Sequence, residues 1–381
     1  MKKIGILNFQ HVNDNYGAVI QAAALAYTIK KQGIKNVEHI NFIPEDNFPP
    51  PVPLSLSKRV KRLLTRNFIS ILKQKVSNRK QVIGNSDTFE NFRQNYLPRT
   101  EKCYRNLHEL SEIKNDYSAI IVGSDQVWRL TYTTKFAKVY FLSFASKSTL
   151  RISYAASFGL DYWEGGKESA LTLSIKDELN KFSTISVREK SGIDICSNIF
   201  NVKATHVLDP TLLVDYQFYE NILCKNKKKD NKDIVFHKLD LNDVFLDFTS
   251  KIATHLQCNM HNIYHKKHSG KRFFTDVPEW LSQIKNSELV ITDSFHCVCF
   301  SIIFKKQFLC IVNEKRGIER LQSLLSDLGL LDRLCFDYSL ASTKRILDKE
   351  IDYTTVDNKL NQLRDISTTF LKNTLSKVKD K

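Results

Sequence analysis

Leu289-Val290-Ile291-Thr292-Asp293-Ser294-Phe295-His296 is the stretch with the clearest structural signal in the chain. Its first three residues are apolar, and they run directly into polar and titratable side chains. This pattern is typical of a buried strand in a parallel sheet whose carboxyl end lies at a functional site. The apolar residues between 298 and 304 predict a short buried helix, so residues 292–296 are expected to form the turn between strand and helix.

Side chains in such a turn lie where open α/β sheets bind ligands. Ligands sit outside the carboxyl ends of the strands, and helix N-termini hold anions there. Asp293, Ser294 and His296 are therefore candidates for chemistry. An ordinary N-cap and a hydrogen-bonded structural histidine explain the same residues, so spacing alone leaves both interpretations open.

Size and charge narrow the class of protein. At 381 residues the chain exceeds a typical single core, so two α/β domains are the expected organisation. Lys and Arg outnumber Asp and Glu by 57 to 41, and the net charge of +16 favours anionic partners such as phosphates, anionic lipids or nucleic acid. A nucleic-acid binder is disfavoured, because the basic run lacks interleaved aromatic residues and no DNA or RNA module is visible.

Cysteine use and apolar runs favour a cytoplasmic location. The eight cysteines show no disulfide-framework spacing, which is typical of reduced thiols. Residues 1–9 have the pattern of a first strand rather than of a signal peptide. No apolar run approaches the ~20 residues that span a bilayer.

Periodicity divides the chain into two α/β halves. In the first half it predicts strands at residues 4–9, 118–122, 152–156 and 184–187 and a helix at 18–31. In the second half it predicts strands at residues 234–239, 260–264, 289–292 and 308–312 and helices at 242–256, 278–284 and 318–328. The charged residues 225–232 are the best linker candidate. We therefore expect an N-terminal α/β domain at residues 1–224, a C-terminal α/β domain at 233–350, and a helical tail at 351–381 that returns to the first domain.

A basic segment interrupts the first half. Residues 56–80 carry apolar side chains at helical spacing and nine Lys or Arg, and no acidic residue occurs from 47 to 86. Such a segment suits an anionic membrane surface. A solvated helix packed by one face on its own domain explains the segment equally well.

Two turns of the first half carry binding candidates. Asn15, Tyr16 and Gly17 precede the first helix, and the exposed amides of this turn suit an anion or a sugar, although close packing explains Gly17 equally well. Arg188 ends the strand at 184–187. Its planar fork suits a carboxylate or a phosphate, and a salt bridge to a nearby carboxylate is the competing interpretation.

Another polar turn follows the strand at 118–122. A sugar needs hydroxyl partners and a stacking surface. Both are offered here by Ser124, Asp125, Gln126 and Trp128.

One cluster suggests a metal. It consists of His255, Cys258, His261, His265 and His268. These residues do not match a zinc-finger pattern, and a strand through residue 264 points alternating side chains to opposite faces. We expect no metal and interpret residues 265–268 as a basic loop that faces a cleft.

Five stretches, in order, resemble the polysaccharide pyruvyl transferase family. They are Asn15-Tyr16-Gly17-Ala18; Ile120-Ile121-Val122-Gly123-Ser124-Asp125-Gln126-Val127-Trp128; Ser153-Tyr154-Ala155-Ala156-Ser157-Phe158-Gly159; Ile185-Ser186-Val187-Arg188-Glu189 with Val207-Leu208-Asp209-Pro210-Thr211; and Ile291-Thr292-Asp293-Ser294-Phe295-His296. The resemblance spans residues 4 to 333 approximately. One departure is Cys297, since the family usually carries Gly after this His, and the bulkier side chain is expected to shrink the pocket or change the substrate.

The resemblance implies a fold and a reaction. The fold is α/β, with two Rossmann-like domains facing across a cleft as in B-type glycosyltransferases. The reaction moves pyruvate from phosphoenolpyruvate onto two hydroxyls of a sugar, in a cell-surface polysaccharide or its lipid-linked precursor, and forms a cyclic ketal. Phosphoenolpyruvate is the donor substrate, and no cofactor or metal is expected. A nucleotide-sugar-dependent glycosyltransferase of the same architecture is the alternative.

The resemblance also implies roles for the candidate residues. His296, with Asp293, is expected to act as general acid or base. The donor is expected to contact Arg188, Ser294 and, in the polar turn 313–317, Arg316. The acceptor is expected on the side of the N-terminal domain, at Asn15, Tyr16, Gly17, Ser124, Asp125, Gln126 and Trp128.

Overall fold

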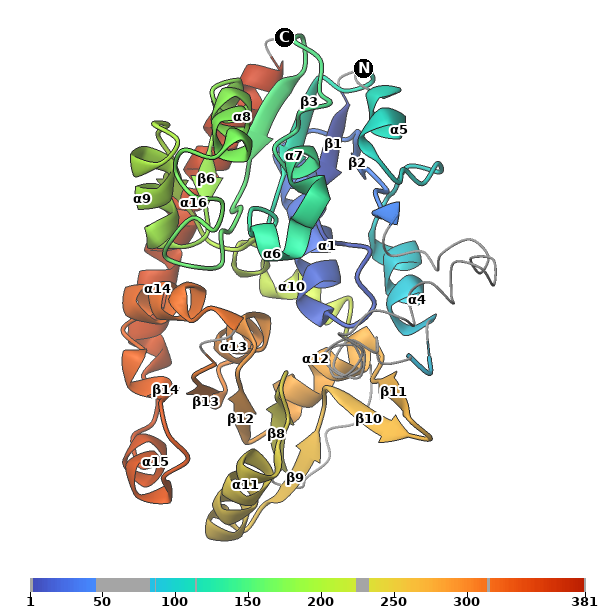
Figure 1. Ribbon diagram of the computed structural model, residues 1–381. Helices are drawn as coiled ribbons and strands as arrows, with labels where there is room; N and C mark the ends of the chain where they lie inside the picture. The colour runs from blue at the N-terminus through green and yellow to red at the C-terminus, as the bar shows by residue number, and fades with distance from the viewer. Residues whose placement is uncertain are drawn as a thin grey trace, which may run out of the picture.

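Two parallel β-sheets form the centres of the two halves of the molecule (Figure 1). The computed structural model describes residues 3–45, 83–85, 87–113, 115–223, 233–313 and 316–379. The first sheet has the order β2 (Val37–His39), β1 (Ile4–Leu7), β3 (Ala119–Val122), β4 (Leu150–Ser153) and β5 (Phe182–Thr184). The second has the order β14 (Leu334–Cys335), β13 (Gln307–Ile311), β12 (Leu289–Thr292), β8 (Asp233–His237) and β9 (Asn259–Asn262). The central strands β1, β3 and β12 are apolar and buried along their whole length, as expected for parallel sheets covered on both faces.

Two small ladders depart from the expected pattern. The single strand expected at 184–187 is divided into β5 and β6 (Ser186–Val187), and β6 pairs with β7 (Thr205–His206). The basic loop expected at 265–268 is instead β10 (His265–His268), which pairs antiparallel with β11 (Lys271–Phe274). The other strands expected in the two halves lie within three residues of their predicted bounds.

The helices cover both sheets. Those of the first half are α1 (Tyr16–Lys31), α4 (Asp87–Tyr96), α5 (Leu107–Ser111), α6 (Leu130–Thr133), α7 (Ala137–Tyr140), α8 (Ala170–Leu179), α9 (Lys190–Asn198) and α10 (Tyr216–Glu220). Those of the second half are α11 (Asp243–Leu256), α12 (Val277–Asn286), α13 (Phe295–Ile303), α14 (Glu319–Leu328), α15 (Leu340–Leu347) and α16 (Tyr353–Lys379). Short 3₁₀ turns occur at η2 (Thr134–Phe136), η3 (Pro210–Leu212) and η5 (Leu331–Arg333). The helices predicted at 18–31, 242–256, 278–284 and 318–328 are confirmed within two residues, and α1 begins early because the Asn15 side chain accepts the Ala18 N–H as an N-cap. The helix predicted from the apolar residues 298–304 is α13, which begins three residues earlier because Ser294 caps it, so His296 lies in the first turn of the helix and not in the turn before it.

The two halves are packed together through α1 and α16. Tyr16 of α1 stacks on Trp280 of α12, with ring centroids 4.6 Å apart and planes 4° apart. Helix α16 leaves the second half and runs back along the first (Figure 1). Its residues Leu371, Leu375 and Val378 belong to the same buried cluster as Ile4 and Ile6 of β1. These contacts join the two sheets into one frame for the cleft between them.

Some expectations fall on parts of the chain that the structure does not describe. The basic segment 56–80 and the linker candidate 225–232 lie outside the described residues. Within the described ranges, no helix combines the length and the apolar character needed to cross a bilayer.

Candidate active site

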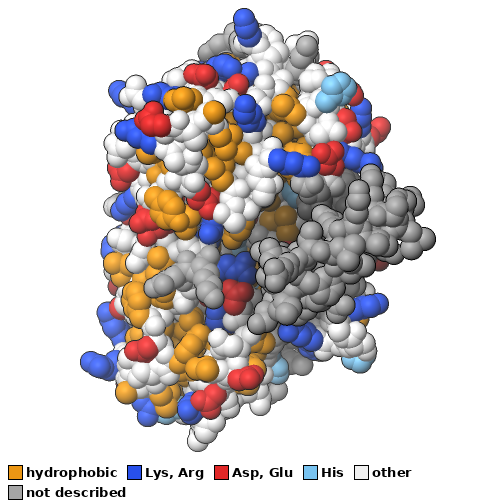
Figure 2. Space-filling model, viewed as in Figure 1, with side chains coloured by type: hydrophobic (Ala, Val, Ile, Leu, Met, Phe, Trp, Pro, Cys, Tyr) orange, Lys and Arg blue, Asp and Glu red, His pale blue; other side chains and the backbone are white. Residues whose placement is uncertain are grey.

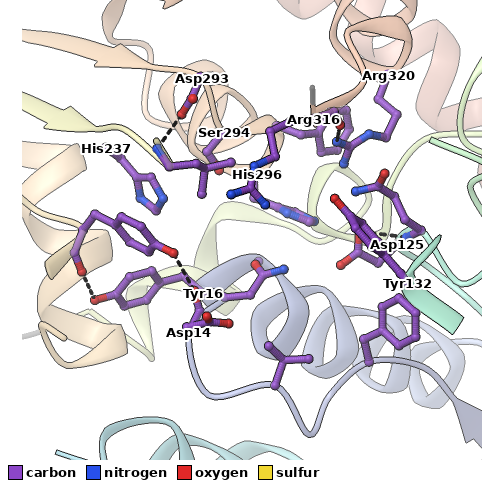
Figure 3. A pocket seen from close by; sticks show the side chains of 18 of the residues that line it. Asp14, Tyr16, Asp125, Tyr132, His237, Asp293, Ser294, His296, Arg316 and Arg320 are labelled. Atoms are coloured by element: carbon purple, nitrogen blue, oxygen red, sulfur yellow. Dashed lines mark hydrogen bonds between the residues drawn. The ribbon is translucent and has the colours of Figure 1, made fainter. Parts of the chain in front are cut away.

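The main cleft is a cavity of about 510 Å³ between the carboxyl edges of the two sheets. Its walls come from the turns after β1, β3, β8 and β12 and from the starts of α1, α13 and α14. The surface is hollowed between the two halves, and basic and acidic side chains lie beside one another in the hollow (Figure 2). His296 lies near the middle of the cleft, with Arg316 and Arg320 to its right and His237 and Tyr16 to its left in the view of Figure 3.

Two helix N-termini border this cleft. Asn15 caps α1 and Ser294 caps α13, where the Ser294 hydroxyl accepts from the Cys297 N–H, and both caps line the cavity. Arg320, in the first turn of α14, lines it as well. The first backbone N–H groups of a helix have no partner within the helix, and the helix dipole adds positive potential there. The cleft therefore favours an anionic ligand.

His296 is held between an aspartate and a glycine. Its Nε2 lies 3.5 Å from Oδ2 of Asp209, which belongs to the turn before η3. A Cβ added to Gly17 would lie 1.9 Å from the Nδ1 of His296, so only glycine allows α1 to approach the ring so closely. Of the two interpretations of Gly17, the structure supports close packing, and it shows that the packed group is His296.

Asp209 is a buried carboxylate, and both of its oxygens accept hydrogen bonds. Its Oδ2 accepts from the Ser124 hydroxyl at 2.9 Å and from the Arg188 guanidinium at 2.8 Å, and its Oδ1 accepts from the Thr211 N–H and hydroxyl. Burial by itself raises the pKa of this carboxyl, but His296, Arg188 and the Thr211 N–H outweigh burial and hold the pKa well below its usual range. Asp209 is therefore an anion that lies against the His296 ring.

Arg188 does not line the cleft. Its guanidinium pairs with Asp209 at 2.8 Å and with Asp125 at 3.2 Å, and the Phe295 ring covers it with its centroid 4.4 Å from the guanidinium carbon. Its side chain is 1% exposed. The competing interpretation, a salt bridge, is what the structure shows, and the expected grip of Arg188 on the donor is not supported by its position.

Arginines that do line the cleft come from other positions. Within the described part of the chain they are Arg272, Arg316 and Arg320. Arg272 pairs with Asp14 at 3.2 Å, and Arg316 binds both carboxylate oxygens of Asp240 at 2.8 and 3.0 Å. The Arg316 hydrogen bonds lower the pKa of Asp240 to about 2.

Arg320 differs from the other two because it has no ion pair with any carboxylate that the structure describes. It is 8% exposed, one of its amino groups donates to the carbonyl of Arg316 at 3.0 Å, and its Nε has no hydrogen-bond partner among the described residues. Burial and the nearby charge of Arg188 lower its pKa to about 10, which still leaves it cationic near neutral pH. Asp125 and Glu189 favour its charge from beyond ion-pair distance, and its Nε still has hydrogen-bonding capacity left. Arg320 is therefore the strongest candidate for contact with an anionic ligand.

Asp293 is fully occupied by its own neighbours. Its oxygens accept from the Lys238 ammonium at 2.6 Å, the Asn313 amide at 2.7 Å and the Leu239 N–H at 2.8 Å. It lines the cleft, but these bonds tie together the ends of β8, β12 and β13. Its expected share in proton transfer stays a prediction, and its geometry is that of a residue that fixes the turn before His296.

A second cleft histidine, His237, was not expected from the sequence. It follows the buried run of β8, stacks on Tyr264 with ring centroids 4.2 Å apart, and accepts the Trp280 indole N–H at its Nδ1. Burial lowers its pKa to about 3. The ring is therefore neutral, and because Nδ1 accepts a hydrogen bond, its proton is on Nε2. His237 therefore offers the cleft a neutral N–H donor.

The remaining acceptor candidates separate into two groups. Asn15, Tyr16, Gly17, Asp125 and Gln126 line the cleft. The Tyr16 hydroxyl, however, donates to the backbone carbonyls of Tyr264 and Thr275, so it secures the two halves to each other.

Two acceptor candidates lie away from the cleft. Ser124 is fully buried against Asp209. Trp128 is fully buried, donates to the Tyr140 carbonyl and stacks on Phe141, so its ring is part of the core and offers no surface to a sugar.

Cys297 also lies away from the cleft. It is 0% exposed inside α13, and burial raises the pKa of its thiol to about 12. The expectation that it shrinks the pocket is not met, because its side chain does not line the cavity.

Signals for the missed residues exist in the sequence. Asp209 lies in one of the family stretches, His237 lies in the strand predicted at 234–239, and Arg320 lies near the start of the helix predicted at 318–328. Within the part of the chain that the structure describes, no group of three or more His, Cys, Asp or Glu side chains is arranged to hold a metal ion.

Solved structures share this two-domain fold. A UDP-N-acetylglucosamine 2-epimerase from Rickettsia bellii is similar with a TM-score of 0.54 and 11% identity, over 100% of this chain and 97% of that one. A structure of S. aureus MnaA with UDP is similar with a TM-score of 0.53 and 9% identity, over 94% of this chain and 91% of that one. The similarity confirms the predicted class, two Rossmann-like domains facing across a cleft as in B-type glycosyltransferases.

The sequence itself assigns the family. The model of the polysaccharide pyruvyl transferase family matches residues 15–315, and the chain belongs to that family. No protein with a curated description matches the chain significantly. Family and fold together make the protein an enzyme of the transferase type.

Proposed function

We propose that the protein transfers pyruvate from phosphoenolpyruvate to two hydroxyls of a sugar and forms a cyclic ketal. The observation that carries the proposal is Arg320, which is buried, has no ion pair among the described residues and lines a cleft bordered by the N-termini of α1 and α13, beside the His296 and Asp209 pair. Phosphoenolpyruvate carries a carboxylate and a phosphate, so it needs several positive groups in one place. The chain's membership of the pyruvyl transferase family supports the same donor.

Donor binding is assigned to the second half of the molecule. Arg320 binds one anionic group of the donor directly, and the dipole at the N-terminus of α13 adds to its field. Arg316 reaches the other anionic group after it exchanges its contact with Asp240, which is half exposed and therefore well solvated when released. Arg188 does not contact the donor and instead holds Asp125 and Asp209 in place through its two ion pairs.

The proton steps are assigned to His296. Protonated His296 gives its proton to the methylene carbon of the donor, and the neighbouring carbon becomes an oxocarbenium-like centre. One sugar hydroxyl attacks that centre, the bond to phosphate breaks with its electron pair, and the second hydroxyl closes the ring. Of the two hydroxyl protons, one returns to His296 and the other leaves with phosphate. The products are a pyruvate ketal and inorganic phosphate, so atoms and charge balance. The Asp209 carboxylate, 3.5 Å from Nε2, orients the His296 ring for these transfers.

The test is a pair of measurements on the purified chain. Phosphoenolpyruvate should raise the melting temperature, because a ligand that binds the folded state stabilises it. With a sugar that has a free 4,6-diol, the protein should release phosphate, and proton NMR should show a new ketal methyl signal. Stabilisation by a UDP-sugar instead, without any effect of phosphoenolpyruvate, would favour the nucleotide-sugar-dependent glycosyltransferase.

Membrane contact belongs to the same proposal. A lipid-linked acceptor keeps the enzyme at an anionic surface, and the nine cations of residues 56–80 suit such a surface. The protein should bind anionic vesicles in a salt-sensitive way and neutral vesicles weakly. Replacement of Lys58, Arg59, Lys61 and Arg62 by Gln should release it, and equal vesicle binding by this variant would contradict the role of the segment.

A further inference from the structure

A second cavity, here called the side pocket, adjoins the main cleft. Its volume is about 730 Å³, within the range of ligand sites, and it shares Thr131, Tyr132 and Arg316 with the cleft. Its remaining walls come from Arg129 and from residues that follow β8, β13 and β14. A ligand that reacts in the main cleft can therefore continue past Arg316 into the side pocket.

An unusually exposed ring stands at the side pocket. Phe336 is 73% exposed, the largest fraction among the exposed large apolar side chains that the structure describes. Its loop is fixed, since Tyr338 two residues later packs on Phe248 with ring centroids 5.3 Å apart. Tyr132, at the junction with the cleft, is 41% exposed and has the Arg129 guanidinium 4.7 Å from the centre of its ring. Two exposed rings in one cavity are suited to pack against the flat C–H faces of sugar rings.

Planar polar groups complete the side pocket. Asp240 and Arg316 form a two-bond fork, and the Asn313 amide donates to Asp240 at 3.0 Å. Asn242 uses its side-chain oxygen as the cap of α11 by accepting the Phe245 N–H, so its amide hydrogens are directed elsewhere. Carboxylate, amide and guanidinium groups can each bond neighbouring hydroxyls of a sugar. Aromatic rings beside such groups are the chemistry of a carbohydrate site rather than of a purely apolar one.

We propose that the side pocket is a carbohydrate subsite for the sugar next to the one that reacts, so the acceptor is an oligosaccharide. The inference rests on the proposed function, which places the reacting sugar in the main cleft. It adds a residue, Phe336, that neither the family stretches nor the main cleft includes. Arg316 lines both cavities, whereas Asp240 lines the side pocket, so the Asp240 carboxylate is left to accept from sugar hydroxyls when Arg316 turns to the donor.

The experiment compares short and long sugars on the full chain by titration calorimetry. The probes are the methyl glycosides of glucose, galactose and N-acetylglucosamine and, matched to them, cellotetraose, a β-linked galactotetraose and chitotetraose. At least one tetrasaccharide should bind the wild type about fivefold more tightly than its methyl glycoside, as expected for one ring contact. Phe336→Ala should reduce that ratio towards one, because the variant should lose more affinity for the tetrasaccharide than for the methyl glycoside.

The matched control is Tyr162→Ala, which removes a ring that is 60% exposed and lines neither cavity. This variant should keep the wild-type ratio. Equal affinity for short and long sugars, no binding of any tetrasaccharide, an unchanged ratio in Phe336→Ala, or displacement of the tetrasaccharide by UDP would each overturn the subsite. A failure of the proposed function is seen separately, because a protein that prefers the tetrasaccharide but makes no ketal from phosphoenolpyruvate has the subsite without that reaction.

Discussion

Both sides of the cleft carry arginine and aspartate, but they use them in opposite ways. The first edge is formed by the turns after β3, β6 and β7, and the second edge by the turns after β8 and β13 and the start of α14. At the first edge Arg188, Asp125 and Asp209 satisfy one another beneath the Phe295 ring. At the second edge Arg320 lines the cleft without a counter-ion in the described part of the chain, and Arg316 holds a half-exposed partner. We call the first edge a closed network, because its charged groups pair with one another, and the second edge an open network, because some of its charged groups are left to bind a ligand.

This difference separates the residues that support the catalytic histidine from the residues that contact the substrate. A closed network fixes the positions of its side chains and keeps its carboxylates charged. Asp209, one of these carboxylates, lies 3.5 Å from His296 and so orients its ring. An open network has binding capacity left for a substrate. We therefore assign contact with the donor to the second edge, and we assign to the first edge the orientation of the histidine that works between them.

The largest expected effect is on the group that lies between the two edges. His296→Asn should lower the turnover number by about 10²–10⁴-fold, the usual contribution of a general acid or base, because Asn cannot exchange protons near neutral pH. The melting temperature should change little, because Asn keeps a hydrogen-bonding side chain near Asp209. Phosphate release and ketal formation under saturating donor measure the effect. Turnover near that of the wild type would remove His296 from the proton steps.

The next effect tests the closed network. Arg188→Gln leaves Asp125 and Asp209 buried without their cation, so it should reduce the free energy of unfolding by about 3–5 kcal/mol. Urea denaturation at neutral pH measures this loss. A stable variant with a raised KM for phosphoenolpyruvate would show that Arg188 contacts the donor and that the first edge is open after all.

The same substitution at the open edge should behave differently. Arg320→Gln removes a charged hydrogen-bond donor from the substrate, and the KM for phosphoenolpyruvate should rise by about 10–100-fold. Its unfolding free energy should stay near the wild-type value, because no ion pair of Arg320 is lost among the described residues. A large loss of stability with normal donor kinetics would reverse the comparison between Arg188 and Arg320.

How much of this arrangement the sequence predicts depends on the type of signal. The apolar runs predict both sheets, because a buried parallel strand is a local pattern. The strand-end rule places Asp293 and His296 correctly at the cleft. Helix and strand bounds shift by a few residues where caps and ladder pairing decide them, as at Asn15 and at β5 with β6.

Long-range pairing is what the sequence does not show. Arg188 is adjacent in the chain to a strand end, as expected, but whether it points into the cleft depends on Asp209 and Phe295, which are 21 and 107 residues away and are known only from the fold. Trp128 fails for the same reason, since its ring faces the core because Tyr140 accepts its N–H. A residue type indicates which chemistry is available, and only its buried neighbours decide whether the substrate can reach it.

Acid should lower the free energy of unfolding through His237, which lies at the second edge. Its pKa is lowered to about 3 in the folded chain, against about 6.5 when unfolded, so between these values the unfolded state binds one more proton. Stability therefore rises with pH in this window, and the contribution of the neutral ring is complete above about pH 6.5 and is lost as the pH falls towards 3. His237→Asn should reduce the slope of unfolding free energy against pH by about 1.4 kcal/mol per pH unit between pH 4 and 6. An unchanged slope would show that His237 becomes charged in the fold.

The smallest effect concerns Cys297, next to His296 but on the side of α13 that faces the core. Cys297→Gly should lower the free energy of unfolding by about 1–2 kcal/mol, because it removes a buried side chain and because Gly favours a helix less than Cys does. The thiol is buried and uncharged near neutral pH, and its side chain lines neither cavity, so it has no route to the substrate. The range of accepted sugars should therefore be the same in the wild type and the variant, measured as relative kcat/KM over the three methyl glycosides. If the variant accepted a sugar that the wild type rejects, the core face of α13 would have to be coupled to the open edge, and the separation between support and contact would not hold at this helix.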